Sequence, residues 1–416
     1  MNDDTPKEKK KKIRCMNVKT LIIFKERMFE DIEGKQKKQR NSTWSRNPKI
    51  KRRTMEGFAL FLVALVSMGI TNLAMVPGKT NRNVSAMYLL GDSSVDSGSN
   101  TLFYPIIHLN LSLLPCNGSN SILLPYLLAK KMGLPYAEPF YAQNGTIDGL
   151  LNGVNYGAAH ATILSPTSLS HQSLNHQLRQ VFETVQLLEL QLGHESSRHF
   201  IRSSLFYLAF GKDDYIDLFL RNFSGVMAEY NGPQFAEILV NQMVHAVMNL
   251  YDMNVRKVVL MGILPLGCAP SLLFQWHIDD ATGCVEMINE VILRYNVLLE
   301  KSIVRLNEEL PDAHLVFCDL YQGVKKIITY PQFFGFEDAK NACCGLGLYG
   351  AEIGCVTSDI ACNTVSANVW WDLYNPTPKV NSLLAESTWS GQQLLSNICR
   401  PTTIRGLVYS SVSPPT

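Results

Sequence analysis

A serine that follows a short apolar run is the residue of this chain best placed for chemistry. Residues 86–90 are apolar and predict a buried strand, and Gly91-Asp92-Ser93 comes directly after them. Open α/β sheets hold their ligands at the carboxyl ends of their strands, which is where Ser93 would lie. A serine hydroxyl there can attack a carbonyl carbon when a histidine removes its proton, a carboxylate orients the histidine, and N–H donors stabilise the oxyanion. Small polar turns of this kind are also common without a function, so other parts of the chain must supply these partners.

The elements that would position this serine alternate between strand and helix. Short apolar runs predict further strands at residues 205–210, 258–261 and 315–317. Apolar residues at helical spacing predict helices at 125–132, from Pro233 to 250, and at 285–306. Strands joined through helices imply crossover connections and a mostly parallel sheet between helices. No internal repeat or low-complexity linker divides this region, so we expect one domain.

Charge is divided unevenly along the chain. Residues 1–54 hold 18 Lys and Arg against 7 Asp and Glu, whereas the remaining residues hold 20 against 29. Residues 58–70 are uncharged, and this run is short for a membrane-spanning helix but suits the hydrophobic part of a signal peptide. We therefore interpret 1–54 as a basic, unstructured extension, 55–78 as a signal peptide or signal anchor, and 79–416 as the functional domain. A basic arm that binds nucleic acid or anionic membranes is the less favoured alternative, so we expect no nucleic-acid partner.

Glycan acceptors and cysteines both favour the secretory pathway. Asn-X-Ser/Thr acceptor sequences occur at Asn83, Asn110, Asn117, Asn144 and Asn222. Nine of the ten cysteines follow the apolar segment, which predicts a disulfide framework with one cysteine left over. A zinc site is disfavoured because no histidine follows His314 and no Cys-x-x-Cys occurs. We expect a secreted domain; with an uncleaved anchor, the domain would face the lumen and touch the membrane only through that segment.

Blocks of sequence between residues 86 and 400 resemble, in the same order, the plant GDSL-type esterase/lipase branch of the SGNH hydrolases. The nucleophile block is Gly91-Asp92-Ser93 with Asp96, Gly98 and Asn100. Further matching blocks are Gly153-Val154-Asn155-Tyr156, Gly211-Lys212-Asp213-Asp214-Tyr215, Leu264-Pro265-Leu266-Gly267-Cys268, Ala342-Cys343-Cys344-Gly345 and Trp371-Asp372-Leu373-Tyr374-Asn375-Pro376-Thr377. The resemblance implies a three-layer α/β/α, flavodoxin-like SGNH fold. It also implies a secreted enzyme, located in the apoplast, that hydrolyses lipid or acyl-sugar esters without a cofactor or metal.

The resemblance implies a nucleophile at Ser93 and an orienting acid at Asp372, but three other functional positions depart from the family. Asn375 stands where the family has its histidine, and an asparagine cannot accept a proton near neutral pH. Asp213 stands at the oxyanion asparagine, where a carboxylate would repel the developing negative charge. His160 stands at the oxyanion glycine and can still donate its backbone N–H. By analogy with serine proteases, losing a triad member lowers turnover on the order of 10⁴ to 10⁶.

These departures leave three hypotheses. The first is a secreted ester hydrolase with weakened activity. The second is a catalytically inactive extracellular protein that binds a lipid, a cell-wall glycan or an acyl ester. The third is a relocated relay, in which Ser93, His160 and Asp213 form a catalytic group from the other side of the serine. On a purely structural interpretation, Asn375 only precedes the helix that Thr377 and Pro378 predict.

One further pattern suggests a dinucleotide site, which we do not expect. Residues 345–350 match Gly-x-Gly-x-x-Gly. The segment follows two cysteines instead of an apolar strand, and the residues after it do not predict a helix. Because dinucleotide binding needs both elements, we expect no cofactor.

Overall fold

The computed structural model of the chain describes residues 84–96, 123–143, 145–164, 172–220, 225–276, 283–355, 358–391 and 395–410. All of these lie in one compact unit, Arg82–Thr416. The basic extension, the apolar segment, the five acceptor asparagines and Cys116 lie outside the described residues.

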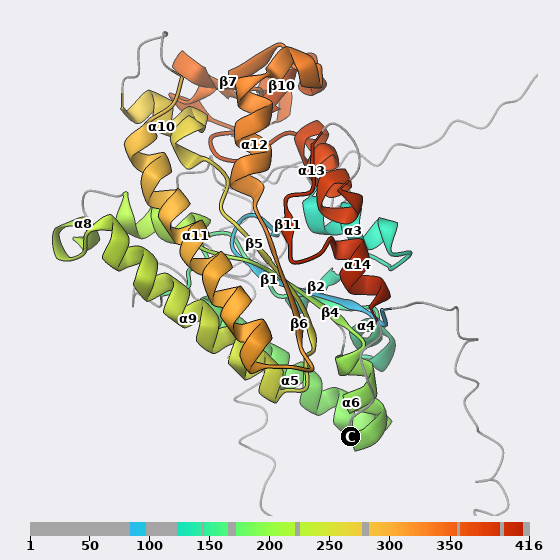
Figure 1. Cartoon of the computed structure of the whole chain (residues 1–416). Coiled ribbons are helices and arrows are strands. Elements are labelled where there is room, and N and C mark those ends of the chain that lie inside the picture. The colour runs from blue at the N-terminus through green and yellow to red at the C-terminus, as the bar shows by residue number, and fades with distance from the viewer. Residues whose placement is uncertain are drawn as a thin grey trace, which may run out of the picture. The chain divides into compact units, whose positions relative to one another are not determined.

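A seven-stranded sheet runs through the centre of this unit (Figure 1). Its strands are β1 (Met87–Gly91), β2 (Glu138–Pro139), β3 (Val154–Asn155), β4 (Leu205–Ala209), β5 (Lys257–Met261), β6 (His314–Cys318) and β11 (Cys399–Arg400). Their order is β11-β6-β5-β4-β1-β3-β2, and only β11 and β6 are antiparallel. Every residue of β1, β4 and β5 is buried, because a parallel sheet covered on both faces exposes neither. The predicted, mostly parallel sheet is confirmed.

Helices cover both faces of the sheet. On one side α5 (Leu174–Leu192), α9 (Gly232–Asp252) and α11 (Glu286–Glu309) pack together, and on the other α3 (Leu124–Lys131) packs with α13 (Pro378–Ser390) and α14 (Ile404–Tyr409) (Figure 1). The other described α-helices are α4 (Ile147–Leu151), α6 (His194–Arg202), α7 (Lys212–Asp214), α8 (Val226–Glu229), α10 (Pro270–Gln275) and α12 (Leu320–Thr329). None of the described helices combines the length and apolar composition that crossing a membrane requires. The expected three-layer α/β/α fold is confirmed.

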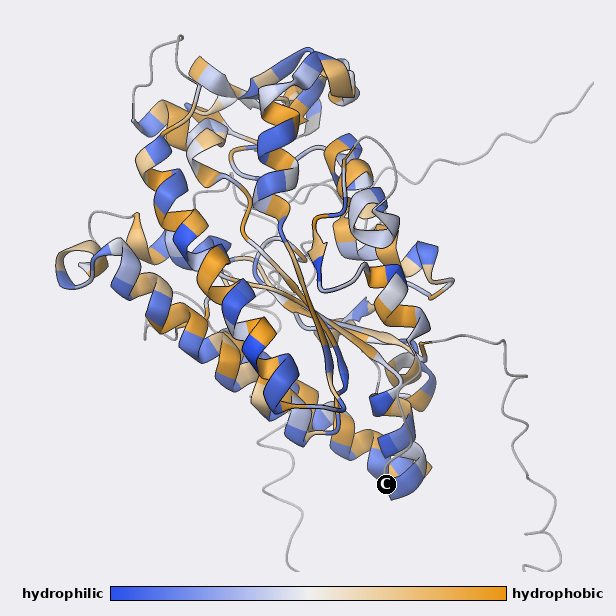
Figure 2. Ribbon diagram, viewed as in Figure 1, coloured by the Kyte–Doolittle hydropathy of each residue, from blue (hydrophilic) through white to orange (hydrophobic). Residues whose placement is uncertain are grey.

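Helices α9 and α11 illustrate how the sequence specifies these layers. Asn231 caps α9: its side chain accepts the N–H of Gln234, whose own side chain accepts the N–H of Asn231. The predicted apolar stripe is buried at Phe235, Leu239, Met243, Val247 and Leu250. Helix α11 begins at Glu286, one residue later than predicted. Figure 2 shows apolar and hydrophilic positions recurring along both helices, as expected of helices with one face on the core.

Four disulfides hold the C-terminal part of the unit. They join Cys268 to Cys284, Cys318 to Cys399, Cys343 to Cys362, and Cys344 to Cys355. Two small ladders lie in this region: β7 (Asp338–Ala342) with β10 (Asn368–Trp370), and β8 (Gly345–Leu346) with β9 (Ile353–Gly354). The glycine-rich segment 345–350 therefore belongs to a disulfide-linked hairpin and not to a strand–helix turn. The predicted disulfide framework is confirmed, and Cys116 is the remaining cysteine after the apolar segment.

Candidate active site

The pairing of β1 with β4 brings two sequence blocks to the same edge of the sheet. The strands are parallel, with Gly91 opposite Ala209, and the N–H of Asp92 donates to the carbonyl of Ala209. Gln177 of α5 fixes the end of β1, because its side-chain amide bonds both the N–H and the carbonyl of Gly91. The turn that holds Ser93 and helix α7 therefore begin side by side.

Ser93 is hydrogen-bonded to the carboxylate of Asp213. Its hydroxyl donates to Asp213 Oδ1 at 2.6 Å, and its backbone N–H donates to Oδ2 at 3.0 Å. The backbone N–H of His160 donates to the same Oδ2 at 2.8 Å. Two converging backbone N–H groups are the arrangement that stabilises an oxyanion during acyl transfer. Here the side chain of Asp213 takes the place that the oxyanion would need.

His160 keeps the backbone conformation that a glycine would adopt at this position. Its φ of 61° lies in the left-handed region, which raises the energy of a non-glycine residue by about 1–2 kcal/mol. This conformation aims its N–H at Asp213. Its ring contacts Asp217, with 2.7 Å between Nδ1 and Oδ2, and both side chains are largely buried. Asp217 lies in a π-helical turn, Tyr215–Phe219, that directly follows α7.

The relocated relay of Ser93, His160 and Asp213 is not formed in the expected order. Asp213 does join Ser93 to His160, but through the backbone N–H of His160 and not through its ring. The reason is the left-handed backbone at His160, which turns the N–H toward Asp213 while the ring pairs with Asp217. Ser93, Asp213 and His160 are therefore connected by hydrogen bonds, but the imidazole of His160 contacts Asp217.

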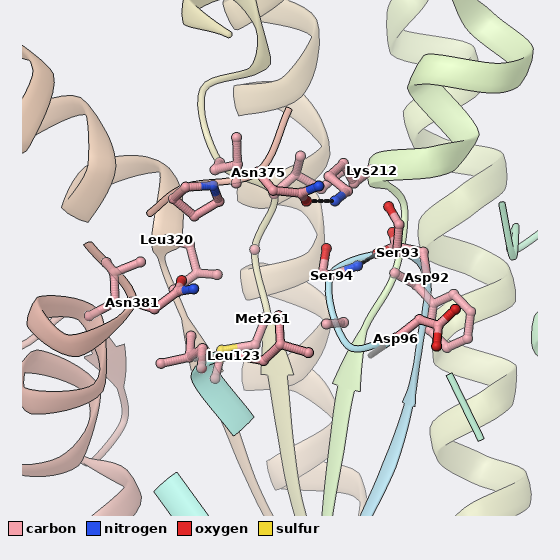
Figure 3. Close-up of a pocket in the computed structure, with 18 of the residues that line it drawn as sticks. Asp92, Ser93, Ser94, Asp96, Leu123, Lys212, Met261, Leu320, Asn375 and Asn381 are labelled. Carbon is pink, nitrogen blue, oxygen red and sulfur yellow. Dashed lines mark hydrogen bonds between the residues drawn. The ribbon is translucent and has the colours of Figure 1, made fainter. Parts of the chain in front are cut away.

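The predicted acid and the residue at the histidine position also meet, on the opposite side of the serine. Asn375 Nδ2 donates to Asp372 Oδ2 at 3.0 Å, which is the contact an orienting acid would make with a histidine. Asn375 Oδ1 accepts a hydrogen bond from Lys212 Nζ at 2.7 Å (Figure 3). Within the described part of the chain, Asn375 and Ser93 share no hydrogen bond. The result is a chain of contacts, Asp372–Asn375–Lys212, that contains no proton acceptor for the serine.

A pocket opens beside Ser93. Ser93, Lys212, Asp372 and Asn375 lie on its polar side, and Figure 3 shows Lys212 and Asn375 joined by their hydrogen bond. Its apolar lining is formed by Leu123, Leu124, Met261, Ile263, Leu264, Leu320 and Leu384. Asp92, Ser94, Asp96 and Asn381 also line the pocket, so it combines an apolar wall with a polar, charged side, as expected of a site for a ligand with an apolar part and a polar part.

Asp92 connects the two groups electrostatically. Burial and the negative charge of Asp213 raise its pKa from 3.8 to about 7, while the positive charge of Lys212 opposes that shift. Its oxygens accept the N–H groups of Ser94 and Asp213. Burial also raises the pKa of Asp372, although hydrogen bonds from Asn375 and Tyr374 work against the shift. The site therefore holds several carboxyl groups close to a single lysine.

Sequence reasoning missed the roles of Lys212 and Asp217. Lys212 stands at a variable position of its motif, directly before Asp213, so no rule of spacing singled it out. Asp217 follows Asp213 by four residues, and only the π-helical turn places it beside His160. A lysine directly before two aspartates in a motif-bearing turn was the one available signal. The described residues contain no group of three or more histidine, cysteine and acidic side chains that could hold a metal ion.

Known proteins of one family are similar to this chain over most of its length. The family model for GDSL-like Lipase/Acylhydrolase matches residues 87–388. One Arabidopsis thaliana GDSL esterase/lipase is 29% identical over 347 residues, which cover 80% of this chain and 92% of that relative. Another, GDSL esterase/lipase 7, is 28% identical over 322 residues, covering 73% and 87%.

A solved structure, an α/β hydrolase from the metagenome of Lake Arreo, matches at a TM-score of 0.34 and 12% identity, covering 72% of this chain and 91% of that one. The family model alone covers well over half of the sequence, from the first strand to α13. This chain belongs to the GDSL-like lipase/acylhydrolase family.

Proposed function

We propose that this protein is a secreted ester hydrolase of weakened activity that takes short acyl esters or lipids into the pocket beside Ser93. The family supports the reaction class, and Ser93 supports the identity of the nucleophile. The observation that argues for weakened activity is Asp213, whose carboxylate holds both backbone N–H groups beside the serine. A substrate carbonyl oxygen cannot enter that position while Asp213 occupies it.

The missing base lowers the proposed activity further. Asn375 holds the place of the histidine and bonds Asp372 and Lys212, and neither its amide nor the ammonium of Lys212 can accept the proton of Ser93. The one acceptor bonded to the hydroxyl is Asp213, which would have to leave the oxyanion position to admit a substrate. Base and oxyanion site are therefore mutually exclusive in this arrangement.

Secretion is part of the same proposal. Four disulfides in one domain are typical of proteins that fold in an oxidising compartment. The apolar segment at residues 58–70 and the five acceptor asparagines support the same route.

A second candidate is a binding protein without catalysis, and the self-occupied oxyanion site is the specific observation in its favour. It would keep the pocket for an acyl ester, a lipid or an acylated cell-wall glycan. In this case Ser93 would serve only as a partner for Asp213.

Hydrolysis of a fluorogenic butyrate ester separates the two candidates. The full chain is produced in a secreting host so that its disulfides form, and wild type is compared with Ser93→Ala. Slow turnover that disappears in Ser93→Ala supports the weakened enzyme. Equal turnover in both, together with equilibrium binding of ethyl hexanoate, supports the binding protein. Absence of both turnover and binding would contradict the proposal.

A further inference from the structure

Lys212 is a buried cation that no carboxylate neutralises by direct contact. Its side chain lines the pocket, and the residue is only 4% exposed. In the described part of the chain its single hydrogen-bond partner is Asn375 Oδ1, a neutral amide oxygen. An ammonium group has three N–H donors, so two of them are available to whatever fills the pocket. A buried charge is strongly disfavoured unless it is paired, which makes this ammonium a binding group for an anion.

The nearby carboxylates are directed elsewhere. Asp372 accepts hydrogen bonds from the side chain and N–H of Asn375 and from the N–H of Tyr374. Asp92 accepts the N–H groups of Ser94 and Asp213. The positive charge of Lys212 lowers the pKa of both carboxyl groups and so opposes the effect of burial. Among the described residues, neither carboxyl group forms an ion pair with Lys212. Among the described residues, the ammonium therefore contacts the neutral amide oxygen of Asn375 and no carboxylate.

The rest of the pocket suits a short hydrocarbon chain. Leucine, isoleucine and methionine side chains form most of the wall away from Lys212; Figure 3 shows Leu123, Met261 and Leu320 on that side, together with the polar Asn381. The cavity holds about 70 Å³, which is room for a few waters at roughly 10–15 Å³ each or for a short chain in their place. The other polar anchor of an acyl group, the pair of backbone N–H groups beside Ser93, is closed by Asp213.

We propose that Lys212 binds the head group of a short-chain carboxylate whose hydrocarbon chain lies along the leucine-rich wall of this pocket. The inference rests on the proposed ligand class, an acyl group, and specifies its form as the free acid and not the ester. Charge-assisted hydrogen bonds are roughly twice as strong as neutral ones, so a carboxylate gains more from Lys212 than an ester carbonyl does. Lys212 thereby provides the polar anchor that the oxyanion site no longer offers.

Three probes with the same chain length test this inference. Hexanoate, ethyl hexanoate and hexanol are titrated into the full-length protein, and dissociation constants are measured by calorimetry or ligand-observed NMR. The variants are Lys212→Met, Lys212→Gln and, as a matched control, Lys301→Met on the exposed face of α11. Thermal unfolding is recorded for each variant, so that weaker binding is not confused with loss of the fold.

We expect wild type and Lys301→Met to bind hexanoate at least about tenfold more tightly than hexanol, a difference of about 1.4 kcal/mol. Lys212→Met should weaken hexanoate binding at least tenfold and leave hexanol binding unchanged. Lys212→Gln keeps a donor without the charge, so it should bind hexanoate no better than the ethyl ester. This second variant decides the question if Lys212→Met does not fold.

Three failures can be told apart. If hexanoate binds wild type and both Lys212 variants within twofold, the role of Lys212 is refuted while an acyl-binding pocket stands. If none of the three probes binds wild type, the proposed ligand class fails and this inference fails with it. A wild type that prefers the ethyl ester over hexanoate would contradict the carboxylate assignment alone.

Discussion

The two sides of the site differ in what has been kept. Beside Ser93, the backbone still has the shape of an oxyanion site, including a left-handed residue at His160, but a carboxylate of the chain itself fills it. On the other side, Asp372 still makes the hydrogen bond that would orient a base, but its partner is Asn375. The side-chain oxygen of Asn375 in turn accepts a hydrogen bond from Lys212. The first side has lost room for the substrate oxygen. The second has lost the proton acceptor.

The comparison shows that retained geometry and retained chemistry are separate properties. Removing one oxyanion donor lowers turnover by about 10² to 10³, and removing a triad member by about 10⁴ or more. Effects of residues that act as a unit are not additive, so repair of one side should recover little while the other stays altered. Variants that repair each side separately and together test this directly.

The largest effect is expected when both sides are repaired. Asp213→Asn replaces an acceptor in the oxyanion site by an amide donor, and Asn375→His supplies a base that Asp372 can orient. We expect the double variant to hydrolyse a short acyl ester at least about 10³-fold faster than wild type, and each single variant to recover far less. The measurement is kcat/KM for each of the three variants.

Two further variants complete this experiment. Ser93→Ala added to the double variant should abolish the gain. Lys212→Gln is added in parallel, because the ammonium would donate to the new imidazole as it now donates to Asn375. A double variant that stays as slow as wild type in both backgrounds would refute the idea that these two residues limit the activity.

A smaller effect, on the pH dependence of stability, is expected at Asp92, whose pKa is changed by the charges of Asp213 and Lys212. Its pKa in the folded protein is about 7, against 3.8 ordinarily. Between these two pH values, Asp92 is protonated in the folded state and ionised in the unfolded state. Stability therefore falls as pH rises through this window, by up to about 1.4 kcal/mol per pH unit from this group. Asp92→Asn should make the unfolding temperature less dependent on pH between about pH 5 and 7.

Buried Asp214 and Asp372 also have raised pKa values, and the charge of Asp92 contributes to the shift at Asp214. The difference between the two curves therefore reports Asp92 together with its effect on Asp214. Parallel curves would show that Asp92 titrates in its ordinary range. The electrostatic connection between the two sides would then be wrong.

The smallest effect is expected behind the Ser93 side, at the pair of His160 and Asp217. Asp217→Asn should lower the free energy of unfolding by about 1–2 kcal/mol, since it removes the charge from a buried hydrogen bond. In a His160→Gly background the same substitution should matter less, because the partner is gone and the glycine relieves the left-handed strain. A coupling free energy below about 0.5 kcal/mol in this double-mutant cycle would show that the contact between His160 and Asp217 does not stabilise the folded protein.

The sequence was sufficient to predict the scaffold and insufficient for the contacts of the altered residues. Strands β1, β4, β5 and β6 were predicted because buried parallel strands are continuous apolar runs, whereas β2, β3 and β11, with two residues each, are too short to give such a signal. The family resemblance identified Ser93, Asp372 and the three departures. No sequence pattern could show that Asp213 accepts three hydrogen bonds, because two come from Ser93 across the sheet edge and the third depends on the backbone direction at His160.

A boronic acid tests, without requiring catalysis, whether Asp213 occupies the oxyanion site. The hydroxyl oxygen of a serine bonds the boron of butylboronic acid and releases its proton to the solvent, and the resulting tetrahedral, negatively charged adduct is stable when the oxyanion site can receive one of its oxygens. Boron NMR on wild type, Asp213→Asn and Asp213→Asn/Ser93→Ala should show an adduct only in Asp213→Asn. An adduct of equal strength in wild type would mean that the site is open and that Asp213 does not block it.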